Sequence, residues 1–465
     1  MSDPDEARAL LSQTLDWALG YLESVRDLPV LARATPGEVE AALPSSPPSA
    51  PETIEAILDD VGRILLPAVT HWNHPRFFGW FAVTGSAPGI AGELLSAAFN
   101  VNAMVWRSCP AATELELVAA RWVAQLTGLP AWFGMINDTA STSTLHALVA
   151  ARHAAAPEVR ARGMAGSPLA MYASEEAHSS VDKAVLTLGM GLDSLRKIPT
   201  DDEFRMDPGA LDRAMADDVS DGIRPAAVVA TVGTTSTTSV DPVPAIEEVC
   251  RRYGAWLHVD ASYAGVAAAV PELRWAIAGI ERADSVVVNP HKWLFVPIDC
   301  SVLFLRRPSA VREAFSVVAD YLQTDEDAPN LMDYGVALGR RFRALKLWIV
   351  LRSMGTDRIA ATLREHVRLA NLLASWIQED AGFELLVPVP FSVVNFRAVR
   401  QGASEEELDT MNARLVDAVN ESGEAFLTTT RIRGRLAIHA AIGHLETTED
   451  DVRALWKLLR ERAGG

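Results

Sequence analysis

The sequence predicts an α/β protein in which helices cover both faces of a mainly parallel β-sheet. Between Ala111 and Arg307, helical segments alternate with short apolar runs of strand length, a pattern typical of such sheets. Beyond Arg340 the pattern changes to long helices separated by short strands, which predicts a separate α+β unit. The predicted strands of the main sheet are Trp132–Ile136, Leu169–Ala173, Ala226–Val232, Ala255–Val259, Ser285–Val288 and Ser301–Leu305.

Helical periodicity places the remaining elements of these two parts. The main part contains predicted helices at Glu114–Leu126 and Thr142–Ala155. The predicted elements of the C-terminal unit are helices at Arg341–Ser353, Asp357–Gln378, Glu405–Asn420 and Thr448–Arg462, and strands at Phe383–Val387, Ser392–Phe396 and Leu436–His439.

In the N-terminal part, the sequence predicts two helices joined by an extended connection. A capped amphipathic helix opens the chain, and helical periodicity returns at Glu52–Leu66. Between them, Ala34–Pro51 is rich in proline and serine, which favours an extended segment. His71–Phe81 then gathers histidines, tryptophans and phenylalanines, which suits the buried wall of a core, a subunit contact or a pocket. Taken alone, this segment favours ordinary core.

Composition limits the classes of function. A chain of 465 residues predicts two or three domains, and its net charge of −18 argues against a nucleic-acid or anionic-membrane partner, because like charges repel. Three scattered cysteines, Cys109, Cys250 and Cys300, do not suit a disulfide scaffold or a cysteine zinc site, so we expect a cytoplasmic setting and no metal. The N-terminus lacks secretion-signal features, and no uncharged apolar run approaches the roughly 20 residues that span a bilayer, so we expect a soluble protein.

Polar residues gather in the loops that follow the predicted strands, where ligands of parallel α/β sheets bind. Asn137–Thr144 places hydroxyls and free N–H groups at a helix N-terminus, which suits a phosphate, although serine and threonine also cap helices without a ligand. His178 and the hydroxyl-rich turn Gly233–Thr238 each follow another strand. Asp260 follows the apolar strand Ala255–Val259 and needs a cationic partner, because an isolated buried charge is costly.

Lys292 lies in a polar insert, Asn289–Trp293, between two apolar runs. Desolvation between such runs favours the neutral, nucleophilic amine, but taken alone the spacing favours a strand-end lysine with its head in water. An anion site, a ring-sized histidine, a buried carboxylate and a lysine are together the four contacts that pyridoxal phosphate requires. Their conjunction predicts a pyridoxal phosphate site.

Over nearly its whole length the chain resembles the group II pyridoxal-phosphate-dependent decarboxylases, the aromatic L-amino acid decarboxylase family. Three motifs carry the resemblance: the lysine motif Asn289–Trp293, the aspartate motif His258–Gly265 and the arginine motif Leu338–Arg343. It implies the pyridoxal-phosphate-dependent transferase fold type I, with a seven-stranded, mainly parallel sheet in the large domain. We place an N-terminal helical segment at residues 1–86, the large domain at 87–349 and a small C-terminal α+β domain at 350–465.

The resemblance also implies residue roles. Lys292 would form the Schiff base with the cofactor, Asp260 would pair with the pyridinium nitrogen, and His178 would stack on the ring and assist proton transfer. Tyr321 would donate a proton after loss of CO₂, with Tyr334 as the nearby alternative. The other implied cofactor contacts are Thr139, Ala140, Ser141, Thr235, Ser262, Asn289 and His291, and the implied substrate-pocket residues are Trp72, Trp80, Phe81, Asn102 and Met104.

Four positions bear on specificity and reaction type. Ser262 stands where many family members have alanine against the cofactor face, and Trp80 stands where tyrosine is common. Gly339 matches a position that separates phenolic from indolic substrates in some plant relatives, and it favours room for an indole or a phenyl ring. Tyr321 favours simple decarboxylation, because related aldehyde synthases typically carry phenylalanine there.

The resemblance implies decarboxylation of an aromatic L-amino acid to its amine and CO₂, by a homodimer with active sites at the subunit interface. The alternative within the family is an aromatic acetaldehyde synthase, which decarboxylates and oxidatively deaminates. A non-catalytic binding protein on the same scaffold is disfavoured, because both Lys292 and Asp260 are present. We expect no nucleic-acid or membrane partner.

Overall fold

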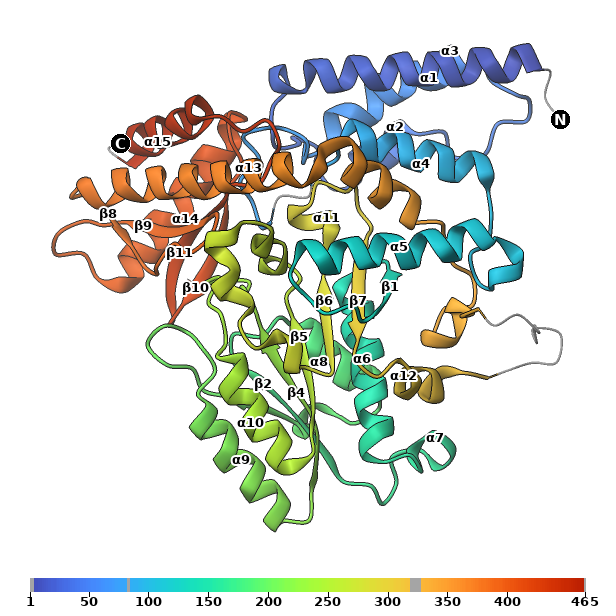
Figure 1. The fold of residues 1–465 in the computed structure, drawn as a ribbon. Helices are drawn as coiled ribbons and strands as arrows, with labels where there is room; N and C mark the ends of the chain where they lie inside the picture. Colours follow the sequence, from blue (N-terminus) through green and yellow to red (C-terminus); the bar gives the residue numbers. More distant parts are fainter. Residues whose placement is uncertain (1–3, 82–83, 318–327, 464–465) are drawn as a thin grey trace. The chain divides into compact units, whose positions relative to one another are not determined.

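The computed structural model describes residues 4–81, 84–317 and 328–463 (Figure 1). The chain divides into two compact units. Unit 1 comprises Met1–Ala82, Leu372–Leu386 and Asn395–Gly465, and unit 2 comprises Val83–Asn371 and Val387–Val394. The helices are α1 (Pro4–Ser24), α2 (Glu38–Ala42), α3 (Ile54–Asp60), α4 (Ala87–Phe99), α5 (Pro110–Leu126), α6 (Ala140–Ala155), α7 (Val159–Arg162), α8 (Ser180–Thr187), α9 (Pro208–Ser220), α10 (Val243–Tyr253), α11 (Pro290–Trp293), α12 (Pro308–Phe315), α13 (Ala344–Glu379), α14 (Glu405–Ser422) and α15 (Glu449–Ala463).

Unit 2 is built on a seven-stranded sheet, counted over the described residues, with the order β1-β7-β6-β5-β4-β2-β3. Strands β3, β2, β4, β5 and β6 run parallel, and β7 is antiparallel to both β6 and β1. This confirms the predicted seven-stranded, mainly parallel sheet of fold type I. The strands are β1 (Phe133–Asn137), β2 (Leu169–Ser174), β3 (Leu195–Ile198), β4 (Arg224–Thr231), β5 (Trp256–Asp260), β6 (Ser285–Val288) and β7 (Ser301–Leu305).

Helices cover both faces of this sheet, as the alternating pattern predicts (Figure 1). On one face α6 crosses β4 to β7, with α8 and α12 beside it. On the other face α9 and α10 pack on β4, and α5 packs on β1. Because both faces are buried, the central strands are apolar on both sides rather than alternating. The core on the α6 side includes Met135, Ala147, Leu148, Met171, Ala173, Val185, Ala227, Val229 and Leu303.

Two elements of unit 2 differ from the sequence prediction. The strand β3 was missed, because as a short edge strand it carries the polar residues Arg196 and Lys197 at its centre. The insert that carries Lys292 is not an open loop but a one-turn helix, α11, in which Pro290 occupies the first position. The predicted break between two helices near residue 355 corresponds to Gly355, which has φ +67° inside α13.

Unit 1 contains a four-stranded sheet, counted over the described residues, with the order β10-β11-β9-β8. Its strands are β8 (Phe383–Leu385), β9 (Val393–Ala398), β10 (Thr428–Ile432) and β11 (Arg435–Ala441). The sequence prediction missed β10. The predicted extended connection contains one short helix, α2, at whose start Glu38 accepts hydrogen bonds from the backbone and hydroxyl of Thr35. Within the ranges that the structure describes, every helix is too short or too polar to cross a bilayer.

The packing of unit 2 predicts that a side chain added at Gly265 would destabilise the fold. Gly265 lies in the 3₁₀ helix η6 (Ala264–Ala269) that follows β5. A Cβ atom there would lie 2.9 Å from the Ala261 Cβ and 3.1 Å from the Val288 Cγ2. We expect Gly265→Ala to lower the free energy of unfolding by about 1–3 kcal/mol through overpacking. Gly20→Ala is the control, because no atom of the described residues lies within 4 Å of that Cβ position on α1. Equal melting temperatures of the two variants would contradict the prediction.

Candidate active site

The carboxyl ends of β5 and β6 are joined by a chain of backbone hydrogen bonds that brings predicted site residues together in unit 2. Asp260 is the last residue of β5, and Ser262 follows it. The Asn289 N–H donates to the Ser262 carbonyl at 3.2 Å, and the Lys292 N–H donates to the Asn289 carbonyl at 3.0 Å. The aspartate and lysine motifs, about 30 residues apart in sequence, are therefore one hydrogen-bonded unit at the sheet edge where ligands bind.

Lys292 is partly buried on α11. Desolvation by the surrounding protein lowers the pKa of its ammonium group, and the charge of Asp260 opposes that shift. A lysine in such surroundings is a better nucleophile, because more of it is the neutral amine. Asn289, just before α11, is buried, and its Oδ1 atom has no hydrogen-bond partner in the described part of the chain. That side chain is thus able to take up a ligand contact.

His178 lies in the loop between β2 and α8 and exposes its ring. Its Nδ1 accepts a hydrogen bond from the Ser180 N–H at 3.1 Å, so the proton of the neutral ring is on Nε2. Desolvation lowers the pKa of His178, the charge of Lys292 lowers it further, and Asp260 opposes both. The charges of Asp260 and Lys292 both affect the pKa of His178, and the charge of Asp260 affects that of Lys292, so the three side chains lie within electrostatic range of one another.

The predicted anion site lies at the N-terminus of α6. Thr139 is the N-cap residue, Ala140 begins the helix, and Ser141 is exposed in its first turn. The N–H groups and the helix dipole at the start of this 16-residue helix favour an anion. Asp138 is the one acidic neighbour within this loop, and its Oδ1 accepts the Thr139 N–H at 2.5 Å.

A buried ion pair that sequence reasoning missed holds the strand leading into this cradle. Glu116 on α5 and Arg340 of the arginine motif are both buried and form an ion pair. Glu116 also accepts the Ile136 N–H at 2.7 Å, and Arg340 donates to the Ile136 carbonyl at 3.1 Å. The arginine motif therefore fixes the end of β1 just before the phosphate loop. In sequence, Glu116 could not be told apart from the exposed Glu114 on the same helix.

The other predicted cofactor contacts differ in exposure. Thr235 is exposed on the turn after β4. His291 is buried, its Nδ1 accepts the Cys300 N–H at 2.9 Å, and burial lowers its pKa to about 4. Tyr321 lies outside the described residues. Tyr334 is buried and stacks on Phe133 with 4.5 Å between ring centroids.

Two of the predicted substrate-pocket residues belong to unit 2. Asn102 is exposed, and its Oδ1 accepts the Arg340 N–H at 2.9 Å. The Met104 carbonyl accepts the Met332 N–H at 3.1 Å. Gly339, next to Arg340, would place a Cβ atom 3.9 Å from the Asn102 Nδ2. The segment with Asn102 and Met104 is thus held against the residues around Gly339.

The other three, Trp72, Trp80 and Phe81, belong to unit 1. Trp80 is 51% exposed and stacks on Trp72 with 5.1 Å between centroids and 12° between planes. Its backbone has φ +47°, and its carbonyl accepts a hydrogen bond from the His439 Nε2 at 2.9 Å. Phe81 is buried. The aromatic segment therefore contains both core and partly exposed rings.

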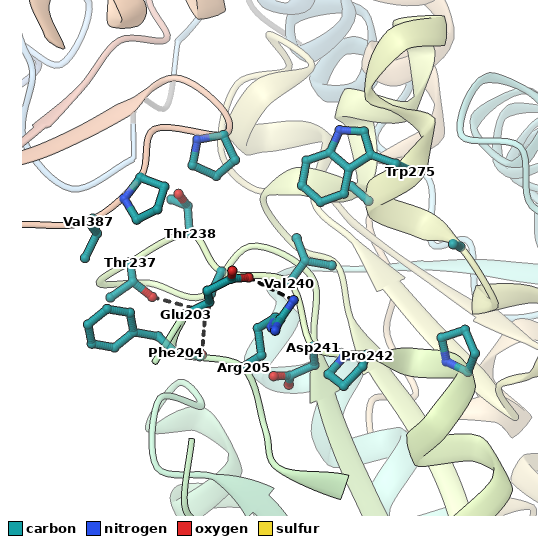
Figure 2. A pocket seen from close by; sticks show the side chains of 16 residues that line it. Glu203, Phe204, Arg205, Thr237, Thr238, Val240, Asp241, Pro242, Trp275 and Val387 are labelled. Carbon is teal, nitrogen blue, oxygen red and sulfur yellow. Dashed lines mark hydrogen bonds and ion pairs between the residues drawn. The ribbon is translucent and has the colours of Figure 1, made fainter. Parts of the chain in front are cut away.

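A pocket of about 290 Å³ lies beside the turn that follows β4, between that turn, Trp275 and the segment from Val387 (Figure 2). Its wall includes Thr237, Thr238 and Asp241. None of the predicted cofactor residues lines it. The candidate site therefore rests on the convergence of Lys292, Asp260 and the α6 N-terminus, not on this cavity.

The residues present fit pyridoxal phosphate. The α6 N-terminus suits its phosphate, and Lys292 has the lowered pKa that a covalent attachment needs. Asp260 offers a buried carboxylate for the ring nitrogen. These features suit three of the four predicted contacts, namely the anion site, the carboxylate and the lysine, and the ring contact of His178 stays a prediction.

The burial of Asp241 predicts how the stability of the fold depends on pH. It is buried, its carboxylate accepts the Met206 and Thr231 N–H groups at 2.7 Å each, and burial raises its pKa to about 6. Between about pH 4 and pH 6 the unfolded chain has released this proton and the folded protein has not, so the stabilisation present below about pH 4 is lost as the pH rises.

We therefore expect the melting temperature of the protein, taken relative to that of Asp241→Asn, to fall as the pH rises from about 4 to about 6 and then to stay constant. Thermal melts of both proteins over this range measure it. A difference that is independent of pH, or that grows with pH, would show that Asp241 does not titrate in this way.

Comparison with known proteins places this geometry in a family. Residues 36–399 match the pyridoxal-dependent decarboxylase conserved domain. The chain is 36% identical over 474 residues to phenylacetaldehyde synthase of Arabidopsis thaliana, covering 99% of this chain and 96% of that protein. It is 37% identical over 479 residues to tyrosine decarboxylase 4 of Petroselinum crispum, covering 99% and 94%. The crystal structure of Oryza sativa TDC with PLP and tryptamine matches with a TM-score of 0.97 at 36% identity, covering 100% and 98%. The chain therefore belongs to the pyridoxal-dependent decarboxylase family.

Proposed function

We propose that this protein decarboxylates an aromatic L-amino acid to the corresponding amine and CO₂. The observation that carries the proposal is Lys292, whose pKa is lowered by desolvation and which is hydrogen-bonded through Asn289 to the segment of Asp260. Relatives of similar length support the substrate class, since one is named a tyrosine decarboxylase and another was crystallised with tryptamine.

Pyridoxal phosphate, when bound, supplies a place for the electron pair left on Cα as the carboxylate departs. In this chain, Lys292 would hold the cofactor covalently and Asp260 would balance positive charge at the ring nitrogen. The N–H groups of Ala140 and Ser141, with Thr139 and Asn289, would bind the phosphate. Thr235, Ser262 and His291 complete the proposed cofactor environment.

His178 and Tyr321 are the proposed proton-handling residues. Because the His178 Nδ1 is occupied by the Ser180 N–H, its exposed side presents Nε2, which carries the proton in the neutral ring. The lowered pKa of His178 keeps that ring neutral near pH 7. Tyr321 would deliver a proton to Cα, with His178 assisting.

The proposed substrate contacts are Trp72, Trp80 and Phe81, with Asn102 and Met104 added from the other subunit. Flat aromatic rings suit an aromatic substrate, because stacked and edge contacts bury large apolar areas. Gly339, held near Asn102 and lacking a side chain, would leave room for an indole or a phenyl ring.

We further propose a homodimer with active sites at the subunit interface, in the cytoplasm, with the domain division given by the sequence. Helix α4 supports a subunit contact, because it exposes a row of apolar side chains: Ile90, Leu94, Leu95 and Phe99. Cys250 and Cys300 are buried free thiols, as a reducing compartment would permit.

The second candidate function is that of an aromatic acetaldehyde synthase. The observation in its favour is the 36% identity to phenylacetaldehyde synthase over 99% of this chain. Tyr321 favours the decarboxylase instead. Incubation with tryptophan, tyrosine, phenylalanine and dihydroxyphenylalanine separates the two. A decarboxylase releases CO₂ and amine, whereas a synthase consumes oxygen and water and releases CO₂, aldehyde, ammonia and hydrogen peroxide.

The first functional prediction concerns Lys292. We expect Lys292→Ala to lose the visible absorbance of covalently bound cofactor and to lower the decarboxylation rate at least about a hundredfold, because no other amine would replace it. Lys183→Ala, an exposed lysine on α8, is the control and should keep both. Normal turnover by Lys292→Ala, together with the visible band, would overturn the cofactor assignment.

The second concerns the reaction outcome. We expect Tyr321→Phe to shift the product from amine toward aldehyde, because the hydroxyl that would protonate Cα is removed while the ring is kept. The measurement is the ratio of amine to aldehyde, with ammonia and hydrogen peroxide assayed in parallel. Tyr334→Phe serves as the comparison, since it removes the hydroxyl of the alternative tyrosine. An unchanged amine yield without aldehyde in Tyr321→Phe would argue against the role.

A further inference from the structure

Ser262 contacts Asp260 in a way that the aspartate motif does not require. Asp260 and Ser262 are both buried at the end of β5. The Ser262 N–H donates to the Asp260 Oδ1 at 3.0 Å, and the Ser262 hydroxyl also donates to Oδ1. The backbone contact is open to any residue other than proline, but the hydroxyl contact needs a side-chain donor. An alanine at this position could not make it.

These two hydrogen bonds leave the carboxylate asymmetric. Both donors occupy Oδ1, whereas Oδ2 accepts no hydrogen bond from the residues that the structure describes. Thr231, the register partner of Asp260 on β4, is buried, and its hydroxyl has no partner among the described residues. The carboxylate is thus fixed through one oxygen, and the other is available to a cation.

Ser262 is itself held in place by the lysine segment. Its carbonyl accepts the Asn289 N–H at 3.2 Å, and the Asn289 carbonyl accepts the Lys292 N–H at 3.0 Å. The preceding residue, Ala261, donates its N–H to the Val287 carbonyl on β6 at 3.0 Å. A donor anchored at several points has little rotational freedom left, so it can fix the orientation of the group to which it donates.

We propose that Ser262 is a positioning residue that acts through Asp260. Its hydroxyl holds Oδ1 and thereby directs Oδ2 toward the positively charged ring nitrogen of pyridoxal phosphate. Ser262 does not need to touch the cofactor for this role. The inference rests on the proposed function, because it takes Asp260 as the partner of that nitrogen.

The test measures the dissociation constant of pyridoxal phosphate after removal of the cofactor, together with visible circular dichroism per bound cofactor. Ser262→Ala removes the donor, and Ser262→Cys keeps a side chain of similar size with a weak donor. We expect both to bind the cofactor about tenfold more weakly and to reduce the dichroism, because loss of a charge-assisted hydrogen bond frees the carboxylate. Thr113→Val removes a buried hydroxyl on α5 that has no hydrogen-bond partner among the described residues, and it should change neither quantity.

A double-mutant cycle shows whether Ser262 acts through Asp260. We expect Ser262→Ala to have less than about a twofold effect on cofactor affinity when Asp260→Ala is already present. Three results would overturn the inference: unchanged affinity in Ser262→Ala, wild-type affinity in Ser262→Cys with loss only in Ser262→Ala, or an equal loss with and without Asp260.

The same experiment separates this inference from the proposed function. If Asp260→Ala alone binds the cofactor as tightly as the natural protein, the assignment of Asp260 fails and the inference falls with it. If Asp260→Ala weakens binding and the Ser262 variants do not, only the role of Ser262 is wrong.

Discussion

The candidate site depends on the burial of an acidic and a basic side chain at one edge of a sheet. A charge moved out of water costs several kcal/mol unless it is paired or hydrogen-bonded. The chain meets this cost for Asp260 with two hydrogen bonds from Ser262, and for Lys292 with a shift of its pKa toward the neutral amine. A carboxylate held by hydrogen bonds and an amine whose pKa is lowered are what the proposed cofactor contacts require.

The parallel sheet is what makes this arrangement possible. Strands β4, β5 and β6 all end at the same edge, so residues that follow them meet although they are distant in sequence. Because each strand is buried on both faces, most of its residues are apolar, and the polar loop residues that follow it lie in the region where ligands of such sheets bind. The strand before the α6 loop is held as well. Glu116 and Arg340 form an ion pair, and each makes a hydrogen bond to the backbone of Ile136 on β1.

The sequence predicts the main sheet well because its central strands are continuous apolar runs. It fails at β3 and β10, where polar residues on exposed or edge positions hide the strand signal. The site motifs were predictable because Lys292, Asp260 and His178 are unusual at strand ends. Partners such as Glu116 were not, since a buried glutamate and an exposed one follow the same helical pattern until the fold sets their surroundings. For the same reason, the sequence shows Ser262 only as a departure from alanine, and its donor role is visible only in the geometry.

Two acidic side chains, Asp260 and Asp138, would affect binding of the proposed cofactor in opposite ways, because they lie beside groups of opposite charge. Asp260 sits where a cationic ring nitrogen is proposed, so its charge is favourable. Asp138 sits beside the anion cradle and accepts the Thr139 N–H, so it competes with a phosphate for a donor and repels it. The carboxylate of Asp138 also lies just before the positive end of the α6 dipole, which stabilises the helix when no anion is bound. The proposed phosphate contact would therefore have to displace Asp138 from the Thr139 N–H, whereas the proposed contact of Asp260 needs no such change, because Ser262 already donates two hydrogen bonds to it.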